Sequence, residues 1–376
     1  TPVETLNNTA YPLPSGSRED GWKHILAPIL LMVFLFPSLA LSERDNPVPA
    51  PGIEGISSLT QVAQLTGAPP AMNNTDLVNV YGTDLGSMFS HSDGRLYFLF
   101  GDTFGPPGPP GSAGWRSNTM AYTTDFVAGD GITFDGWITD AMGNAMALVE
   151  GDHDSNNGSG EVTKIPTAGW SIGGRQFMWF MSVKEWISGG VWEVNHSEIA
   201  YSDDNGDSWI LSGTQWPGSS NFIQVALAEQ AEYLLIWGIP AGRHGGVKLA
   251  RVLPSDILNG DSYEYFTGTG WSSNEADGQV IIESPVGELS VLWNPHFESW
   301  IMMYLNEVSG SIEVRGARDP RGPWSQPLQV VSRNDYPALY GAYMHSQYTE
   351  NNGETVYFLM SQFGHYNVFL MRVIFE

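Results

Sequence analysis

Residues 80–105 read VYGTDLGSMFSHSDGRLYFLFGDTFG, and this stretch predicts a β-hairpin. Two apolar, aromatic runs flank the turn SHSDG at 90–94, and an Asp-Gly pair between such runs is typical of a hairpin. A hairpin folded about this turn brings the start of its first strand beside the end of its second strand. Asp84 then lies opposite or diagonal to Asp102, at the open end of the hairpin.

Two carboxyl groups placed in this way suit the hydrolysis of a glycosidic bond. One carboxyl protonates the leaving oxygen, and the other attacks the sugar or activates water. A separation near 5 Å predicts retention of the anomeric configuration, and one beyond roughly 6.5 Å predicts inversion. The alternative is that each aspartate caps a turn, because TDLG and GDT are both turn-like sequences. The sequence does not decide which carboxyl is the acid.

The hairpin is the first copy of a pattern that recurs along the chain. After residue 75, short aromatic or β-branched runs alternate with Gly, Asp, Asn and Pro clusters, without a convincing amphipathic helix. Each copy has an inner strand with small residues, a very apolar strand and a third strand, and such repeats predict propeller blades. The copies span 84–126, 166–204, 222–253, 287–320 and 340–375, with outer strands predicted at 131–140, 208–215, 262–271 and 324–331.

The fifth copy ends after its third strand, so its outer strand must come from elsewhere. Residues 57–66 (SSLTQVAQLT) are the candidate, and their pairing would remove exposed strand edges. We therefore predict an all-β, five-bladed β-propeller with an N-terminal strand closing the last blade; a β-sandwich is the alternative. Residues 202–209 (SDDNGDSW) fit the Asp-box pattern, in which the aspartate bonds turn amides and the tryptophan packs beneath the hairpin.

Composition narrows the class of partner. The 376 residues are 42% hydrophobic and carry a net charge of −25, which repels nucleic acid and anionic membranes. Cysteine is absent, which excludes disulfides, zinc thiolate sites and a thiol nucleophile. The 14 Trp and 15 Tyr suit clefts that stack on sugar rings, although strand cores account for most of them. We predict a polysaccharide partner and no nucleic acid.

The N-terminal segment predicts export. Residues 25–41 read ILAPILLMVFLFPSLAL, follow Lys23 and His24, and resemble the hydrophobic region of a signal peptide cleaved after Ser42; a signal anchor is the alternative. We predict a leader at 1–42, a linker at 43–56 and a single catalytic propeller at 57–376. The mature protein is expected to be secreted and free of the membrane. The sequons at Asn157 and Asn195 predict a glycoprotein in a eukaryotic host.

Many motifs in the same order carry a family resemblance. They include YGTDLGSMF, GRLYFLFGDTFG, WRSNTMAYTTD, GRHGGVKLARV, PVGELSVLWN, GPWSQP, YGAYMH and SQFGHYNVFLM. Together they resemble the endo-D-arabinanase family of glycoside hydrolases, formerly a secreted domain of unknown function, from about residue 80 to residue 375. The resemblance implies a five-bladed propeller that cleaves α-D-arabinofuranosyl linkages within D-arabinan. It also implies that the aspartates of TDLG and GDT, Asp84 and Asp102, are the catalytic pair.

Further polar and aromatic side chains near the predicted inner strands are candidate sugar contacts. They are Trp115, Arg116, Asn118, Glu161, Gln224, Arg243, Tyr340, His345 and Gln362. Arg116 is alternatively part of a surface ion pair, and Glu161 is either a third acid or an ordinary exposed glutamate. Residues 152–154 (DHD) lie in a Gly, Asn and Ser run that indicates a solvated loop, so we predict no metal and no cofactor.

Two other functions remain open at this stage. A non-catalytic sugar-binding or cell-surface propeller would keep the blades and the aromatic side chains, but it has no need to hold two acids together. A sialidase, suggested by the Asp box, requires an arginine cluster for the sialic carboxylate and a tyrosine nucleophile. The few arginines and the net charge of −25 argue against the sialidase.

Overall fold

The computed structural model describes residues 53–156 and 159–376. The predicted leader at 1–42, the linker up to residue 52 and Asn157 of the first sequon lie outside these residues. Within them there is no α-helix, and six short 3₁₀ helices connect the strands: η1 (Thr75–Val78), η2 (Ala128–Asp130), η3 (Pro254–Asp256), η4 (Gly260–Ser262), η5 (Glu275–Asp277) and η6 (Asn351–Gly353). None of the helices in the described part is long and apolar enough to cross a membrane.

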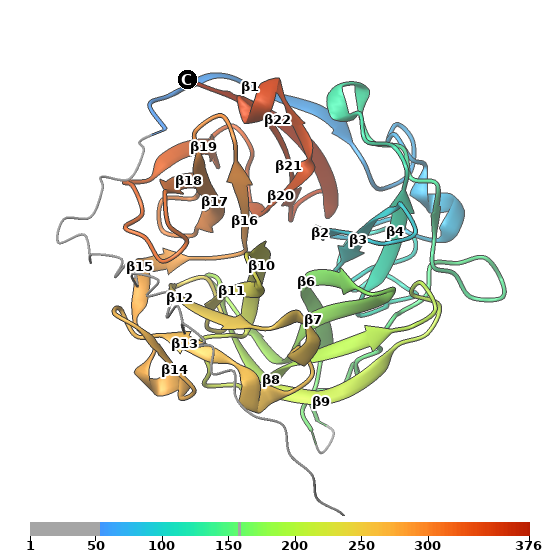
Figure 1. Cartoon of the computed structure of the whole chain (residues 1–376). Helices are drawn as coiled ribbons and strands as arrows, with labels where there is room; N and C mark the ends of the chain where they lie inside the picture. The colour runs from blue at the N-terminus through green and yellow to red at the C-terminus, as the bar shows by residue number, and fades with distance from the viewer. Residues whose placement is uncertain (1–52, 157–158) are drawn as a thin grey trace, which may run out of the picture. The chain divides into compact units, whose positions relative to one another are not determined.

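Five antiparallel sheets stand around a central axis, as the sequence predicts (Figure 1). Blade one holds β2 (Leu85–Ser90), β3 (Leu96–Phe100), β4 (Thr119–Thr123) and β5 (Gly136–Trp137). Blade two holds β6 (Thr163–Ile172), β7 (Arg175–Ile187), β8 (Val191–Ser202) and β9 (Ile210–Pro217). Blade three holds β10 (Gln224–Gln230), β11 (Tyr233–Ile239), β12 (Gly245–Val252), β13 (Glu264–Phe266), β14 (Trp271–Ser272) and β15 (Val280–Val286).

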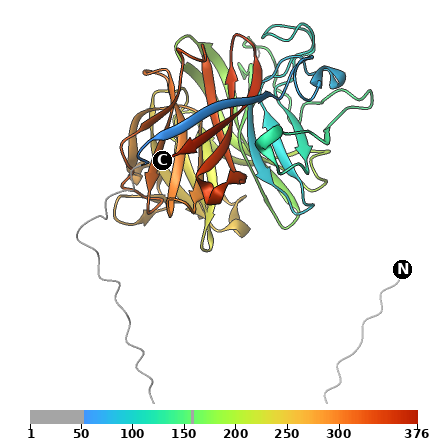
Figure 2. The same cartoon turned by 90° about the horizontal axis from the view of Figure 1, so that it is seen from above.

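The ring is completed by two further blades. Blade four holds β16 (Leu289–Asn294), β17 (Ser299–Asn306), β18 (Ser311–Ala317) and β19 (Leu328–Ser332). Blade five holds β20 (Leu339–Glu350), β21 (Thr355–Gln362), β22 (Asn367–Phe375) and, as its outer strand, β1 (Ile56–Gln64). The N-terminal strand runs antiparallel to β22, from Ile56 beside Phe375 to Gln64 beside Phe369, so the predicted closure is confirmed (Figure 2).

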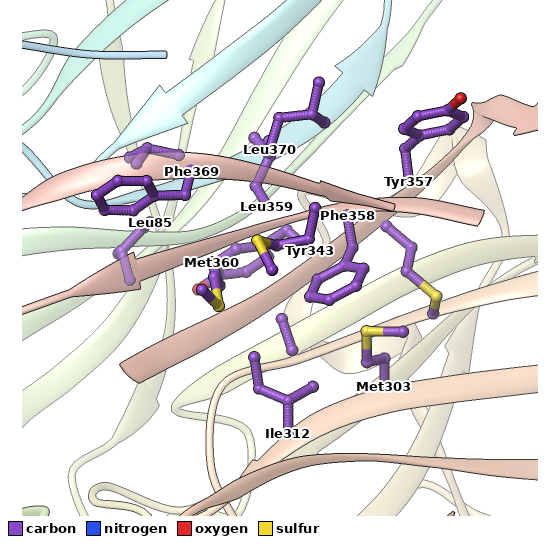
Figure 3. Packing of buried hydrophobic residues seen from close by; sticks show 14 of the residues in the cluster. Leu85, Met303, Ile312, Tyr343, Tyr357, Phe358, Leu359, Met360, Phe369 and Leu370 are labelled. Carbon is purple, nitrogen blue, oxygen red and sulfur yellow. The ribbon is translucent and has the colours of Figure 1, made fainter. Parts of the chain in front are cut away.

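The second strand of each blade is the most apolar, because both of its faces pack against other blades. In blade five, Phe358, Leu359 and Met360 of β21 are fully buried and belong to one hydrophobic cluster with Met303 of β17 (Figure 3). Inner strands carry small residues where neighbouring blades approach closely. At Gly169 of β6, an added Cβ would lie 2.2 Å from a ring carbon of Phe89 on β2, so a larger side chain would push blades one and two apart.

Three local features depart from the predicted pattern or extend it. Strands β7 and β8 are longer than the second and third strands of the other blades, and a turn at 188–190 joins them. Strand β15 was not predicted, and it pairs with the first half of β12. In the Asp box, Asp204 accepts hydrogen bonds from Ser208 N at 2.9 Å and from its hydroxyl, and Trp209 donates to the Gly206 carbonyl at 3.0 Å, so the box closes a turn.

Candidate active site

The first hairpin brings its two aspartates to one end of the central channel. Leu85 pairs with Phe100, and a further bridge joins Gly82 to Phe104. The amide of Gly101 donates to the Asp84 carbonyl at 3.1 Å, which places Asp84 beside the end of β3. Asp84 and Asp102 line the same pocket, at the face of the ring where the inner strands begin.

Asp84 is held by two tyrosines from blade five. Tyr340 donates to its Oδ2 at 2.8 Å, and Tyr366 is also within hydrogen-bonding reach of the carboxyl. Burial raises the pKa of Asp84 to about 7, against the opposing effect of the two tyrosine hydrogen bonds. Nearby Glu288 raises this pKa further, and Arg243 lowers it. Asp84 is therefore a carboxyl group that changes its charge near neutral pH.

Asp102 is 8% exposed and is held through one oxygen. Trp115 Nε1 donates to Oδ1 at 2.7 Å, and the Thr163 hydroxyl donates to the same atom, while Oδ2 has no donor among the described residues. Burial raises the pKa of Asp102 to about 8; the bonds from Thr163 and Trp115 oppose this rise, and the charge of Asp84 adds to it. Burial therefore favours the protonated form of both carboxyl groups, and ionisation of one opposes ionisation of the other.

A third carboxyl group in the pocket is already paired. Arg243 donates to Glu288 through Nε at 3.0 Å and through one terminal nitrogen at 2.7 Å, and its other terminal nitrogen lies 3.3 Å from Glu307. The guanidinium also lies 5.1 Å from the ring centre of Tyr340 and 5.6 Å from that of Trp192. The bidentate contact pairs Glu288 with a guanidinium and leaves Arg243 occupied by protein carboxylates.

The pocket has a volume of about 620 Å³, within the range of small-ligand sites. Its lining includes apolar side chains that remain open to solvent: Trp186 is 47% exposed, Ile187 is 43% exposed and Phe363 is 59% exposed. Trp186 and Ile187 lie at the end of β7, in the long hairpin of blade two. The carbonyl of Gly190 in that hairpin accepts a hydrogen bond of 2.8 Å from the Arg243 amide, which ties the hairpin to blade three.

Four of the nine predicted sugar contacts belong to this site. Gln224, Arg243 and Tyr340 line the pocket, and Trp115 reaches it through Asp102. Two of them already have hydrogen-bond partners in the protein: Arg243 donates to Glu288, and Gln224 donates to the Gly242 carbonyl at 2.8 Å.

Four others lie outside the pocket lining and have partners in the protein. Arg116 donates to the carbonyls of Asn79 and Ala145, and buried Asn118 both donates to and accepts from the backbone around Val149. Glu161 is bonded to Lys164 and to Ser182 rather than standing as a third acid. Gln362 donates to the Pro337 carbonyl at 3.1 Å. Each of these side chains supports a loop or strand near the site.

The ninth, His345, lies at the opposite end of the channel. It lines a separate hollow of about 520 Å³, with Ser90 and Trp293, where the inner strands finish. Strand direction explains this position. Tyr340 lies near the start of β20, at the end of the channel that holds the aspartates, and five residues of extended chain carry His345 to the other end.

Several residues that line the pocket or bond to its aspartates were not predicted from the sequence. Tyr366 precedes β22 in a turn, and Thr163 begins β6, so neither belongs to a motif of its own. Trp186 precedes and Trp192 follows the turn of a hairpin that was predicted to end earlier. The extension of the strand carried only a weak signal, because residues 184–187 (KEWI) do not alternate polar and apolar side chains. In the described part of the chain, no three His, Asp or Glu side chains come together as a metal site.

Comparison with family models gives one match over most of the chain. The model described as Domain of unknown function (DUF4185) matches residues 70–372. Among curated proteins, Notoamide biosynthesis cluster protein J of Aspergillus sp. (strain MF297-2) is 28% identical over 302 residues, covering 75% of this chain and 80% of that protein. A second relative, protein J' of Aspergillus versicolor, is 28% identical over 283 residues, covering 71% of this chain and 76% of that protein.

Solved structures share the fold at low sequence identity. A putative hydrolase from Bacteroides ovatus has a TM-score of 0.56 and 10% identity, covering 80% of this chain and 89% of that one. A family 117 glycoside hydrolase of Zobellia galactanivorans has a TM-score of 0.52 and 12% identity, with coverages of 85% and 91%. An exo-beta-1,3-galactanase of Phanerochaete chrysosporium has a TM-score of 0.50 and 10% identity, with coverages of 84% and 63%. These likenesses establish the propeller fold.

Proposed function

The chain belongs to the family described as Domain of unknown function (DUF4185), and from this membership and the pocket we propose that it is a secreted glycoside hydrolase acting within D-arabinan chains. The observation that carries the proposal is the pair Asp84 and Asp102, two carboxyl groups in one pocket whose pKa values are raised to about 7 and about 8. A glycosidase needs one protonated and one ionised carboxyl group at its working pH, and unequal environments supply this difference.

We propose roles within the pair from the contacts of each carboxyl group. Asp84 accepts hydrogen bonds from Tyr340 and Tyr366, and donors of this kind stabilise an ionised carboxylate. We assign Asp84 as the nucleophile or base. The described residues bond Asp102 through Oδ1 alone, which leaves its Oδ2 without a donor. We assign Asp102 as the acid, which donates a proton from Oδ2 to the leaving oxygen.

The substrate class rests on the motif resemblance and on the properties of the pocket. Exposed Trp186 and Phe363 offer flat apolar faces on which sugar rings stack, and the net charge of −25 favours a neutral polymer over an anionic one. The family likeness in the TDLG and GDT motifs supports α-D-arabinofuranosyl linkages. The leader-like segment at 1–42 supports export to the place where such polymers occur.

The test compares the protein with Asp84→Asn and Asp102→Asn on purified mycobacterial D-arabinan. Reducing-end release and product sizing should give an oligosaccharide ladder from the parent. We expect a loss of at least about 10³-fold in each variant, because each removes one member of the pair. Asp207→Asn, at an exposed turn of blade two, is the matched control and should retain activity. Binding of arabinan without any product from the parent would replace this proposal with a non-catalytic sugar-binding propeller.

A further inference from the structure

The indole that contacts Asp102 is itself covered by an imidazole. The rings of Trp115 and His153 are nearly parallel, with an interplanar angle of 6° and ring centres 3.8 Å apart. Trp115 also stacks with Phe104, with ring centres 5.8 Å apart and an angle of 26°. The indole that donates to Asp102 at 2.7 Å is therefore fixed by neighbouring rings rather than left free to rotate.

His153 is fixed in turn by a small polar cluster. Its Nε2 lies 2.9 Å from the Ser117 hydroxyl and 2.9 Å from Glu150 Oε1. The same Glu150 oxygen accepts hydrogen bonds of 3.0 Å from the amide and from the hydroxyl of Ser117. Ser117 follows Trp115 by two residues, so one cluster holds both the imidazole and the backbone that carries the indole.

The backbone at His153 is left-handed. Its φ is +52°, in a region where Asn, Asp and His are several-fold enriched among residues other than glycine. From this backbone the imidazole lies over the ring of Trp115.

We propose that His153 is a positioning residue that holds Trp115 in the orientation in which Nε1 donates to Oδ1 of Asp102. This proposal deepens the proposed function, because it rests on Asp102 being the acid of the pair. It assigns a role to the loop at 152–154, which neither a metal site nor the catalytic pair explains. Without the imidazole, the indole gains rotational freedom and its hydrogen bond to the carboxyl group weakens.

The charged and titratable groups around Asp102 set the sign of the expected effect. The bonds from Trp115 and Thr163 lower its pKa, whereas the charges of Asp84 and Glu150 raise it, and Tyr366 lies close by. Weakening the Trp115 bond therefore raises the pKa of Asp102. Removing the charge of Glu150 has the opposite effect, so the two changes are distinguishable by direction.

The experiment follows the indole N–H resonance of Trp115 in ¹H–¹⁵N spectra between pH 5 and pH 10. The resonance is assigned by its loss in Trp115→Phe, and it reports ionisation of Asp102 because the N–H bonds that carboxyl group. His153→Asn removes the ring but tolerates the positive φ, so it adds little backbone strain. We expect its titration midpoint to rise by about 0.5–1 pH unit and its N–H to exchange faster with water.

Two further variants separate stacking from charge. His153→Phe keeps a flat ring without the imidazole nitrogens and should restore the midpoint toward that of the parent. Glu150→Gln should lower the midpoint, since it removes a negative charge while keeping an oxygen to accept from Ser117. An unchanged midpoint and exchange rate in His153→Asn, or the same shift in His153→Asn and His153→Phe, would overturn the proposal.

Activity provides a second readout that tests the acid role separately. With D-arabinan, the alkaline limb of the rate against pH should move upward in His153→Asn by the same amount as the resonance midpoint, because the acid must be protonated. A shifted midpoint in a protein without hydrolase activity would retain the role of His153 toward Asp102 and reject the proposed function. An unshifted midpoint in a protein that hydrolyses D-arabinan would retain the proposed function and reject the role of His153.

Discussion

Tyr340, at the start of the innermost strand of the last blade, donates a hydrogen bond of 2.8 Å to Asp84, which precedes the first blade's innermost strand. The two residues are 256 positions apart in the chain, and only closure of the ring brings them together. That closure depends on β1, which pairs with β22 along the outer edge of blade five. The candidate site is therefore complete only when the N-terminal strand has closed the propeller.

The phenol of Tyr340 gives the first prediction. Tyr340→Phe removes the donor to Asp84 but keeps the aromatic ring beneath Arg243. Because the lost bond stabilised the ionised carboxylate, the pKa of Asp84 should rise from about 7. The acidic limb of kcat/KM against pH should move upward by about 0.5–1 unit. Tyr357→Phe, which removes a phenol bonded to Glu350 on the same blade, should leave the limb in place.

The buried carboxyl groups make a second prediction, on stability. Asp84 and Asp102 have native pKa values of about 7 and about 8, above the ordinary value of 3.8, so their protonated forms favour the native state. This stabilisation is fully present below about pH 4 and is lost as the pH rises to about 8. Asp102→Asn has no carboxyl group to ionise. Its melting temperature relative to the parent should therefore increase between pH 4.5 and pH 8.5.

Differential scanning calorimetry at several pH values measures this difference directly. We expect a relative gain of roughly 2–4 °C, which corresponds to about 1 kcal/mol. Asp207→Asn, at an exposed turn, supplies the control slope. A constant difference between Asp102→Asn and the parent across the pH range would mean that Asp102 is already ionised in the native protein at pH 4.5, which would also remove it as the acid.

The ion pair between Arg243 and Glu288 in the pocket lining gives a third prediction. Arg243 and Glu288 are joined by a bidentate contact, with Glu288 only 7% exposed. Arg243→Met leaves Glu288 buried without its partner and should destabilise the protein by about 3–5 kcal/mol. Arg243→Met combined with Glu288→Gln should recover part of that loss. Urea denaturation measures both; an equal loss in the single and double variants would show that the packing of Arg243 over Tyr340 matters more than its charge.

The sequence predicts more of the fold than of the site, because the strands follow from local patterns whereas the site depends on contacts between residues far apart in the chain. Blade strands follow from alternation and turn residues, which are local signals, and the pairing of Asp84 with Asp102 follows from a single hairpin turn. The partners of those carboxyl groups come from other blades. Tyr366 and Thr163 reach them through ring closure and blade packing, which no local pattern encodes. His345 lies at the other end of the channel from the aspartates, because a motif identifies a strand but does not say which end of the strand carries the site.

Trp186 gives the last prediction, on how the polymer is held. Its ring is 47% exposed in the pocket lining and packs edge-on against Trp192, with ring centres 5.3 Å apart, so it offers a fixed face to a sugar. Trp186→Ala should raise KM for long D-arabinan about tenfold, equivalent to about 1.4 kcal/mol. KM for a short aryl α-D-arabinofuranoside should change little, since the bond to be cleaved lies deeper, at the aspartates. Trp293→Ala is the control, because Trp293 is 44% exposed but lines the hollow at the other end of the channel. Equal losses of kcat on both substrates would instead mean that the hairpin of blade two orders the catalytic pair through Arg243.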